Sequence, residues 1–168
     1  MPKIAIDVMS GDHAPAEIIK GCIEASKQTK HHLVLVGDET IVRQELNKYT
    51  YPSEQITIVD AKEIITMEDV PVQAIRQKKN SSMVVGLNLV KSKQADALVS
   101  AGNTGALLAG GTLIVGRIKG IERPALATPI PTDKGYSLLV DCGANADAKP
   151  SYLMQFAHMG TICANCIR

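Results

Sequence analysis

Residues 4–23 decide the fold class of this chain; they read IAIDVMSGDHAPAEIIKGCI. The first three residues form a short apolar run typical of a buried strand, and Pro15 stands where a first-turn proline belongs in a helix. The apolar residues after it recur on one helix face: Ile18, Ile19, Cys22 and Ile23. This stretch therefore predicts a strand, then a polar loop, then a helix.

The same alternation continues along the chain. Further strands are expected at Leu33–Val36, Ile56–Val59, Ala97–Val99, Ala125–Thr128 and Ser137–Val140. Helices are expected at Ile41–Leu46, Met83–Val90 and Thr104–Val115, with a last helix that Pro150 opens. Residues 60–79 are the least regular stretch and are interpreted as a surface excursion. Alternating strands and helices predict an α/β fold in which a parallel or mostly parallel sheet carries helices on both faces.

Length and composition fit a single α/β domain over residues 1–168. Lys and Arg number 18 and Asp and Glu 17, so the net charge of +1 gives no electrostatic footprint for nucleic acid. Four Tyr, one Phe and no Trp leave few rings on which bases could stack. The apolar stretch between Asn103 and Arg117 is too short to span a bilayer, and the N-terminus has no signal-peptide pattern, so a cytoplasmic protein is expected.

The C-terminal stretch keeps helical spacing from Leu153 to Arg168, with no turn cluster to stop the helix. We therefore expect the chain to be the N-terminal portion of a longer protein. Cys163 and Cys166 form a C-x-x-C inside this pattern. No second ligand pair lies nearby, so two thiols on a helix are expected rather than a zinc site, and no metal is expected.

Ligands of open parallel sheets bind beyond the carboxyl ends of the strands, so the loops after the strands are the candidate sites. The first loop, residues 7–15, holds Asp7, Asp12 and His13. Histidine is the side chain best suited to proton transfer near neutral pH. The alternative is structural: the two carboxylates cap the following helix, and His13 is an exposed loop histidine.

The second loop, residues 100–106, joins a strand to a helix and reads SAGNTGA. Gly102 and Gly105 let the backbone approach a ligand closely. N–H groups at a helix start attract phosphate or an oxyanion, and Ser100, Asn103 and Thr104 add side-chain donors. The alternative is a plain helix cap by Asn103 or Thr104. The loop is not the G-x-G-x-x-G of nicotinamide-dependent dehydrogenases, which are therefore disfavoured.

A third loop, residues 141–150, has related composition. It follows an apolar strand, turns at Gly143, carries Asp141 and Asn145, and enters a helix. If it meets the second loop, the two could hold one anion between them. The alternative is an ordinary turn rich in Asn and Asp.

A fourth loop, residues 76–82, combines cations with hydroxyls before a predicted helix. Ser81 or Ser82 is expected to cap that helix. The neighbouring Arg76, Lys78 and Lys79 suit a phosphate or an acidic partner. The alternative is a solvated face without a ligand.

In their order along the chain, these loops resemble those of one family, the bacterial phosphate acyltransferases of phospholipid synthesis (PlsX). The matching stretches are residues 4–7, 11–15, 35–38, 78–83, 100–107, 120–127, 141–147 and 155–160. One departure is Ser10, which stands where the family usually has glycine. Another is length, because family members continue well past the helix at Gly160, so this chain resembles their N-terminal half.

The resemblance implies a three-layer α/β/α fold similar to that of isocitrate and isopropylmalate dehydrogenases and of phosphate acetyltransferases. It implies transfer of a long acyl chain from acyl carrier protein to inorganic phosphate, which yields an acyl phosphate, without an organic cofactor or a metal. A membrane acyltransferase then passes the acyl group to glycerol 3-phosphate. Family members are usually homodimers, and peripheral contact with the membrane stays open. The alternative is a truncated, non-catalytic fragment that binds phosphate or acyl carrier protein.

On this resemblance, the loop residues have expected roles. His13 is expected to protonate the leaving thiolate, oriented by Asp12 or Asp7, and Asn103 and Asn145 are expected to act with it in catalysis. The expected phosphate- and substrate-binding residues are Ser100, Gly102, Thr104, Gly105, Asp141, Gly143, Lys79 and Ser81. Docking of the acidic acyl carrier protein is expected at Arg76, Lys78 and Lys79.

Overall fold

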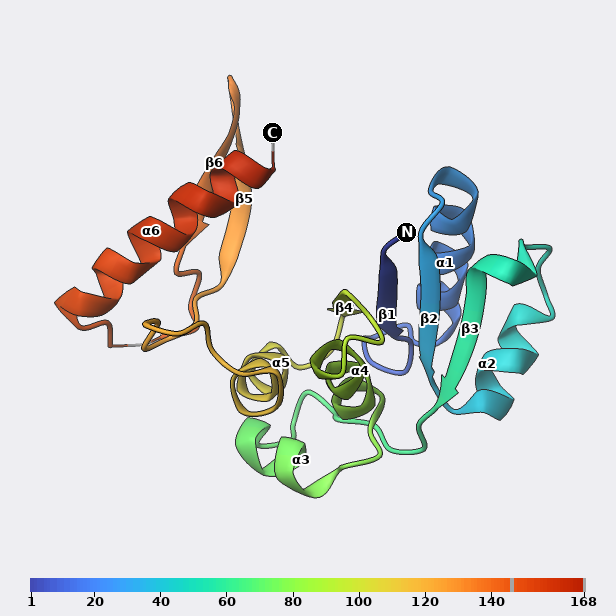
Figure 1. The fold of residues 1–168 in the computed structure, drawn as a ribbon. Helices are drawn as coiled ribbons and strands as arrows, with labels where there is room; N and C mark the ends of the chain where they lie inside the picture. Colours follow the sequence, from blue (N-terminus) through green and yellow to red (C-terminus); the bar gives the residue numbers. More distant parts are fainter. Residues whose placement is uncertain (146, 168) are drawn as a thin grey trace. The chain divides into compact units, whose positions relative to one another are not determined.

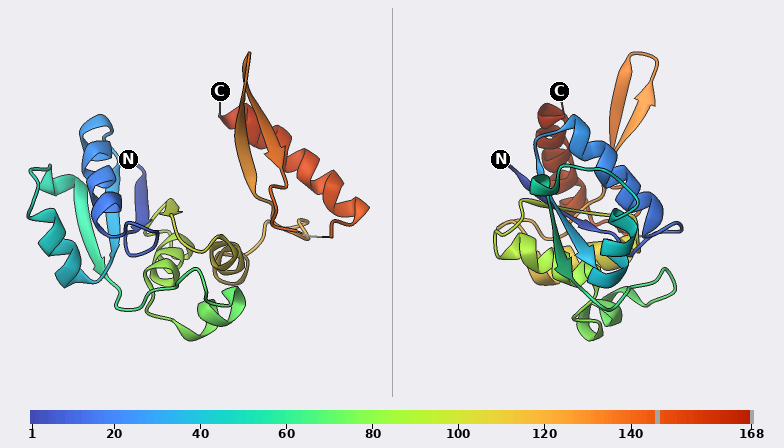
Figure 2. Two further views of the ribbon diagram at one scale, coloured as in Figure 1. Left: turned by 180° about the vertical axis from the view of Figure 1, so that it is seen from behind. Right: turned by 90° about the vertical axis from the view of Figure 1, so that its right-hand side faces the viewer.

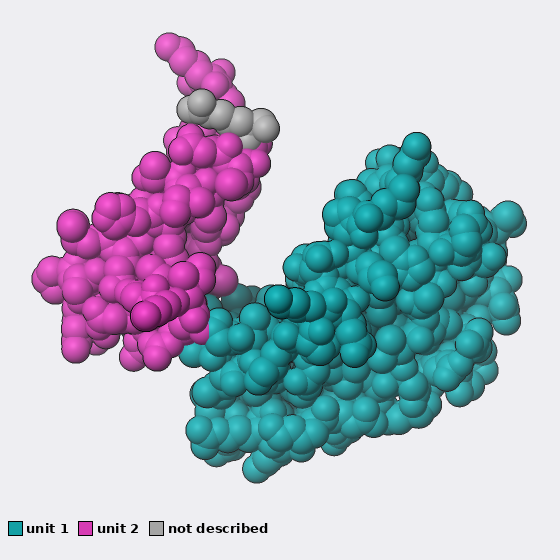
Figure 3. All heavy atoms as spheres, in the orientation of Figure 1, with its two compact units in different colours: residues 1–116 teal, residues 117–168 magenta. Residues whose placement is uncertain are grey.

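A computed structural model describes residues 1–145 and 147–167. The chain forms two compact units, Met1–Gly116 and Arg117–Arg168, which Figure 3 distinguishes by colour. The prediction of a single domain over residues 1–168 stays a prediction.

The first unit is built on a four-stranded parallel sheet (Figure 1). Its strands are β1 (Lys3–Asp7), β2 (His32–Gly37), β3 (Ile56–Asp60) and β4 (Ala97–Ser100), in the order β3-β2-β1-β4. All four predicted strands of this region are present. In the register, Asp7 at the end of β1 lies beside Ser100 at the end of β4. The loops that follow these two strands therefore begin at the same edge of the sheet.

Helices cover both faces of this sheet. Helices α1 (Ala16–Gln28) and α2 (Glu39–Leu46) pack on one face, where Leu33 and Leu35 of β2 join their apolar core. Helix α4 (Ser82–Lys91) packs on the other, where Val34 and Val36 lie. The alternation along β2 thus buries both faces of the strand. The predicted three-layer α/β/α fold with a mostly parallel sheet is confirmed.

A third apolar cluster joins α4 to two short helices, α3 (Pro71–Gln77) and α5 (Thr104–Gly110), with a π-helical turn over Gly111–Val115. Residues 60–79 were expected to be only a surface excursion, and this prediction is wrong for α3. The helix buries Ala74 and Ile75. It is too short to show a periodic apolar pattern, so only Pro71 at its start indicated it.

The second unit combines a hairpin with one long helix. Strands β5 (Ala127–Thr132) and β6 (Gly135–Val140) pair antiparallel in a hairpin (Figure 2). Helix α6 (Pro150–Cys166) buries Tyr152 and Phe156. The two predicted strands exist, but they form their own sheet rather than extending the parallel one. The reason is the short connection, since parallel strands need a crossover of a dozen residues or more. The helical pattern predicted up to Arg168 is described as far as Cys166, and Arg168 lies outside the described residues.

In the described ranges, no helix combines the length and the apolar character that a membrane crossing requires.

Candidate functional site

A buried carboxylate anchors the edge where β1 and β4 end. Asp7 is fully buried, and its Oδ2 accepts a hydrogen bond of 2.8 Å from the hydroxyl of Ser100. The same hydroxyl oxygen accepts the N–H of Gly102 at 3.2 Å, while Asp7 Oδ1 accepts the N–H of Met9 at 3.3 Å. The hydrogen of Ser100 is therefore directed at Asp7, so Ser100 shapes the loop more than it offers a donor to a ligand.

The glycine at position 102 is explained by close packing of the first two loops. A Cβ placed on Gly102 would lie 2.5 Å from the Cβ of Ser10 and 3.0 Å from its Oγ. Next to Ser10, a Cβ added to Gly11 would lie 3.2 Å from the Cβ of Ala101, and Gly11 has a φ of +116°. The loop after β1 and the loop after β4 therefore pack directly against each other.

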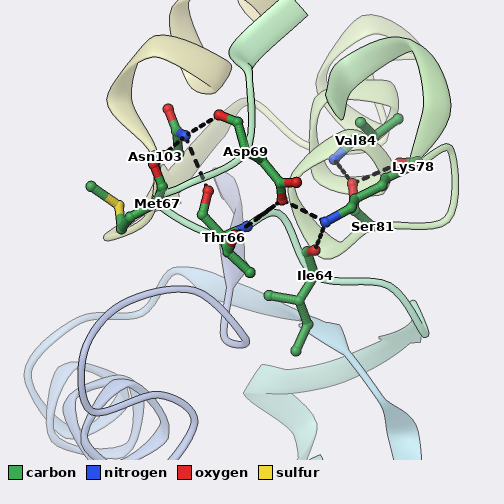
Figure 4. A network of polar contacts seen from close by, with 8 residues as sticks. All are labelled: Ile64, Thr66, Met67, Asp69, Lys78, Ser81, Val84 and Asn103. Carbon is green, nitrogen blue, oxygen red and sulfur yellow. Dashed lines mark hydrogen bonds and ion pairs between the residues drawn. The ribbon is translucent and has the colours of Figure 1, made fainter. Parts of the chain in front are cut away.

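Asn103 uses all of its polar atoms inside the protein. Its Oδ1 caps α5 by accepting the N–H of Ala106 at 2.9 Å. Its Nδ2 donates to the carbonyl oxygens of Thr66, Asp69 and Met67, at 3.1, 3.2 and 3.4 Å (Figure 4). The side chain is only 6% exposed. Asn103 therefore ties residues 66–69 to the start of α5, and its predicted catalytic role stays a prediction.

An ion pair between Lys78 and Asp69 also fixes the segment of residues 64–69. The Nζ of Lys78 pairs with Oδ2 of Asp69 and donates to the carbonyl oxygen of Ile64 at 2.9 Å (Figure 4). The hydrogen bond from Lys78, together with the N–H of Thr66, lowers the pKa of the Asp69 carboxyl below its ordinary value. Lys78, predicted to dock a partner, is thus engaged in fixing residues 64–69.

The other residues of the fourth loop are placed by local bonds as well. Ser81 is fully buried and caps α4, since its Oγ accepts the N–H of Val84 and donates to the carbonyl oxygen of Lys78. Of the two predicted caps, Ser81 is thus the one used. Lys79 donates to the carbonyl oxygen of Ile75 at 3.2 Å, and Arg76 is exposed.

The first turn of α5 presents Thr104 and Gly105 at the surface. A Cβ on Gly105 would lie 2.8 Å from Cγ of Pro71, so this glycine admits the start of α3. Of the phosphate-binding residues predicted in this loop, Thr104 is the exposed side chain, whereas Gly102 and Ser100 are half-buried.

His13 and Asp12 lie exposed in the turn before α1. Among the residues that the structure describes, no hydrogen bond joins His13 to Asp12 or Asp7, and the Asp7 carboxylate accepts from Ser100 and Met9 instead. The loop is where it was predicted, at the carboxyl end of β1. The acid role of His13 and its orientation by a carboxylate stay predictions.

In the second unit, Asp141 and Asn145 close one turn on themselves. Asp141 accepts the N–H of Leu126 at 2.7 Å on Oδ1, and both the N–H (2.8 Å) and the Nδ2 (3.1 Å) of Asn145 on Oδ2. Burial raises the pKa of Asp141, but these hydrogen bonds outweigh it, and the net pKa is lowered. Asn145 Nδ2 also donates to the carbonyl oxygen of Pro124.

Gly143 takes a φ of +86° in this turn, a conformation that favours glycine. Ala146, which belongs to the same motif, lies outside the described residues. The second and third loops lie in different units, so their meeting over one anion stays a prediction.

Comparison with known proteins shows which family the chain matches. The family described as "Fatty acid synthesis protein" matches residues 2–168. The phosphate acyltransferase of Alkaliphilus oremlandii (strain OhILAs) is 57% identical over 162 residues, which are 96% of this chain and 48% of that protein. The phosphate acyltransferase of Clostridium beijerinckii is 56% identical over 161 residues, 95% of this chain and 48% of that protein.

The chain belongs to this fatty acid synthesis family. It spans about half the length of the curated relatives it matches. Among solved structures, the phosphotransacetylase of Streptococcus pyogenes resembles it with a TM-score of 0.68 at 18% identity, over 93% of this chain and 51% of that one. This likeness supports the fold, and the expectation that the chain is the N-terminal portion of a longer protein stays a prediction.

Sequence reasoning missed two contributors to the loops of this family member. Thr66 and Asp69 hold Asn103 and Lys78. Both lie in the stretch interpreted as a surface excursion, where no periodic pattern indicated a buried partner. Only the run Asp69-Val70-Pro71 before α3 could have indicated an ordered turn there.

Proposed function

We propose that this chain carries phosphate acyltransferase chemistry, in which the acyl group of a long-chain acyl carrier protein thioester passes to inorganic phosphate. The observation that carries the proposal is the 57% identity to a phosphate acyltransferase across 96% of the chain. The clustering of Asp7, Ser10, Ser100 and Gly102 at one edge of the sheet supports it, because ligands of parallel sheets bind at that edge.

The reaction needs an anion site more than it needs a strong base. Inorganic phosphate is a mixture of monoanion and dianion near pH 7, and an oxygen of the dianion can attack the thioester carbonyl carbon directly. A C–O bond forms, the carbonyl electrons move to the oxyanion, and the C–S bond then breaks to release a thiolate. The backbone of residues 100–105, with Thr104 exposed, is the candidate set of donors for phosphate in the first unit. The turn of residues 141–145 is a separate candidate in the second unit.

His13 is the candidate that gives a proton to the departing thiolate. It is exposed in the loop after β1, and Ser10 brings that loop into contact with Gly102. A thiol has an ordinary pKa of about 8.5, so a proton donor near neutral pH assists its departure. Asp12, exposed beside it, is the candidate to orient the imidazole when substrate is bound.

The partners follow from this chemistry. The acyl donor is an acidic carrier protein, for which Arg76 and Lys79 are exposed docking cations and the half-buried Lys78 shapes the surface beside them. The family resemblance adds a cytoplasmic homodimer and a membrane glycerol 3-phosphate acyltransferase that takes the product, and it leaves contact of the chain with the membrane open. It uses no cofactor and no metal, and it binds no nucleic acid.

The test is direct turnover by this chain. Palmitoyl-acyl carrier protein and phosphate are incubated with it, and acyl phosphate is trapped with hydroxylamine. Hydroxamate that depends on both phosphate and protein is the expected result. No product, beside an active full-length relative, would contradict catalysis by this chain.

A second candidate is a binding fragment without turnover, which the match to only half of each relative favours. Such a fragment would bind phosphate or acyl carrier protein and unfold cooperatively, yet form no hydroxamate. Calorimetric titration with each ligand separates it from a chain that binds neither.

A further inference from the structure

The side chain of Ser10 is buried between the loop after β1 and the loop after β4. It is 2% exposed, and within the described part of the chain its Oγ has no hydrogen-bond partner. A buried hydroxyl without a partner costs free energy. Hydrogen bonding therefore does not explain a serine at this position, whereas the packing of its Cβ does.

The two loops meet through a pair of matched contacts. Ser10 faces Gly102, where an added Cβ would lie 2.5 Å from the Cβ of Ser10. Gly11 faces Ala101, where an added Cβ would lie 3.2 Å from the Cβ of Ala101. Real Cβ atoms essentially never approach closer than 3.0 Å, so positions 10 and 102 have room for one side chain between them.

We propose that Ser10 is a positioning residue that sets the spacing between the His13 loop and the loop of residues 100–104. This inference rests on the proposed function, because the spacing matters for a proton donor on one loop and an anion on the other. The Cβ of Ser10 acts as a spacer against the Cα of Gly102. A misplacement of about 1 Å between reacting groups can reduce a rate by roughly 100-fold.

The experiment compares Gly102→Ala, Ser10→Gly and the double variant, with Ser10→Ala as the conservative variant that keeps the Cβ. Gly102→Ala puts a second Cβ in the gap and is expected to lower kcat by roughly 10- to 100-fold. The double variant again has one Cβ there and is expected to recover to within about threefold of the wild type. Ser10→Ala is expected to retain the kcat and the phosphate KM of the wild type.

Ser26→Gly serves as the matched control. Ser26 is 3% exposed and lies in α1, away from both loops, so its loss tests whether removing any buried serine side chain produces the same effect. The expected result is a lower thermal midpoint with unchanged kcat. If Ser10 had a merely structural role, Ser10→Gly would likewise lower the thermal midpoint and leave kcat unchanged.

Amide hydrogen exchange of residues 8–13 and 100–104 is the second measurement, and it does not depend on activity. Gly102→Ala is expected to accelerate exchange in both loops, and the double variant to slow it again. If the wild type forms no acyl phosphate, the proposed function fails while this measurement still tests the spacing. A double variant no better than Gly102→Ala, or Ser10→Ala as damaging as Ser10→Gly, would overturn the inference.

Discussion

Ser100, at the end of β4, donates its hydroxyl hydrogen to the fully buried carboxylate of Asp7, at the end of the neighbouring strand β1, over 2.8 Å. The same oxygen accepts the N–H of Gly102, so one hydroxyl links a buried charge to the loop backbone. A buried carboxylate that loses a donor keeps its full desolvation cost. This link therefore joins the stability of the first unit to the shape of its candidate site.

Ser100→Ala is expected to destabilise the chain by about 1.5–3 kcal/mol, because Asp7 loses a charge-assisted hydrogen bond. Urea unfolding at neutral pH measures the change. Ser92→Ala is the control, since Ser92 is exposed and its hydroxyl donates to a carbonyl at the end of α4. If both variants lost the same free energy of unfolding, the hydrogen bond to Asp7 would contribute no more than an exposed one.

Asn103→Ala is expected to cost about 2–3 kcal/mol of stability, because it removes the cap of α5 and three donations to residues 66–69. Asn103→Asp keeps an oxygen for the cap but has no N–H to donate and places a carboxylate beside carbonyl oxygens, so it is expected to be no milder. Asn88→Ala, which loses one donation to a carbonyl in α4, is the matched control. If Asn103→Asp matched the wild type in urea unfolding, the tie to residues 66–69 would be unimportant.

The Asp69–Lys78 pair predicts a pH dependence with a definite sign. The pKa of Asp69 is lowered in the folded chain by Lys78 and Thr66, so the folded state favours its ionised form. Its contribution is fully present above the ordinary pKa of about 3.9 and disappears as pH falls through the lowered value. The difference in urea midpoint between wild type and Asp69→Asn is therefore expected to be constant from pH 7 to 5 and to shrink below pH 4. A difference that grows on acidification would contradict the pairing.

The sequence predicted the strands and helices that carry apolar patterns, and it missed contacts made by single loop residues. Leu33–Val36 and Ile18–Ile23 carry periodic apolar patterns, and both form the elements expected of them. Loop residues such as Ser100 and His13 were placed at the correct sheet edge because strand direction alone decides that. The contacts of Asn103 with residues 66–69 depend on how a loop without periodicity folds back, which no local spacing records.

The hairpin shows a second limit of the sequence pattern. Apolar residues in β5 and β6 indicated strands, but an apolar run carries no information on its partner. Asp133-Lys134-Gly135, with Gly135 at a φ of +124°, joins the strands too tightly for a parallel crossover. The turn chemistry, not the apolar pattern, was the signal that separates this sheet from the parallel one.

Arg76→Glu is expected to raise the KM for acyl carrier protein several-fold at low salt, with little change in kcat. Arg76 is an exposed cation of the predicted docking set with no hydrogen bond to a backbone carbonyl among the described residues, whereas Lys78 and Lys79 donate to carbonyl oxygens of the chain. Attraction between opposite charges at a surface weakens as the Debye length falls, so the effect is expected to vanish near 1 M salt, where that length is about 3 Å. Lys27→Glu, on the exposed end of α1, makes the same charge change elsewhere. Equal effects of the two variants would indicate a response to net charge alone.

His13→Ala is expected to lower kcat with palmitoyl-acyl carrier protein by about 100-fold or more, the scale of general acid catalysis. The leaving group offers the sharper measurement. A thioester of an aromatic thiol releases a thiolate that needs no proton at neutral pH, so the variant is expected to approach the wild-type rate with that donor. His32→Ala is the control. His32 lies at the start of β2, among the amino ends of the parallel strands, and contacts Thr57. An equal loss with both donors would show that His13 binds or orders the loop instead of supplying the proton, and an unchanged kcat would remove it from the mechanism.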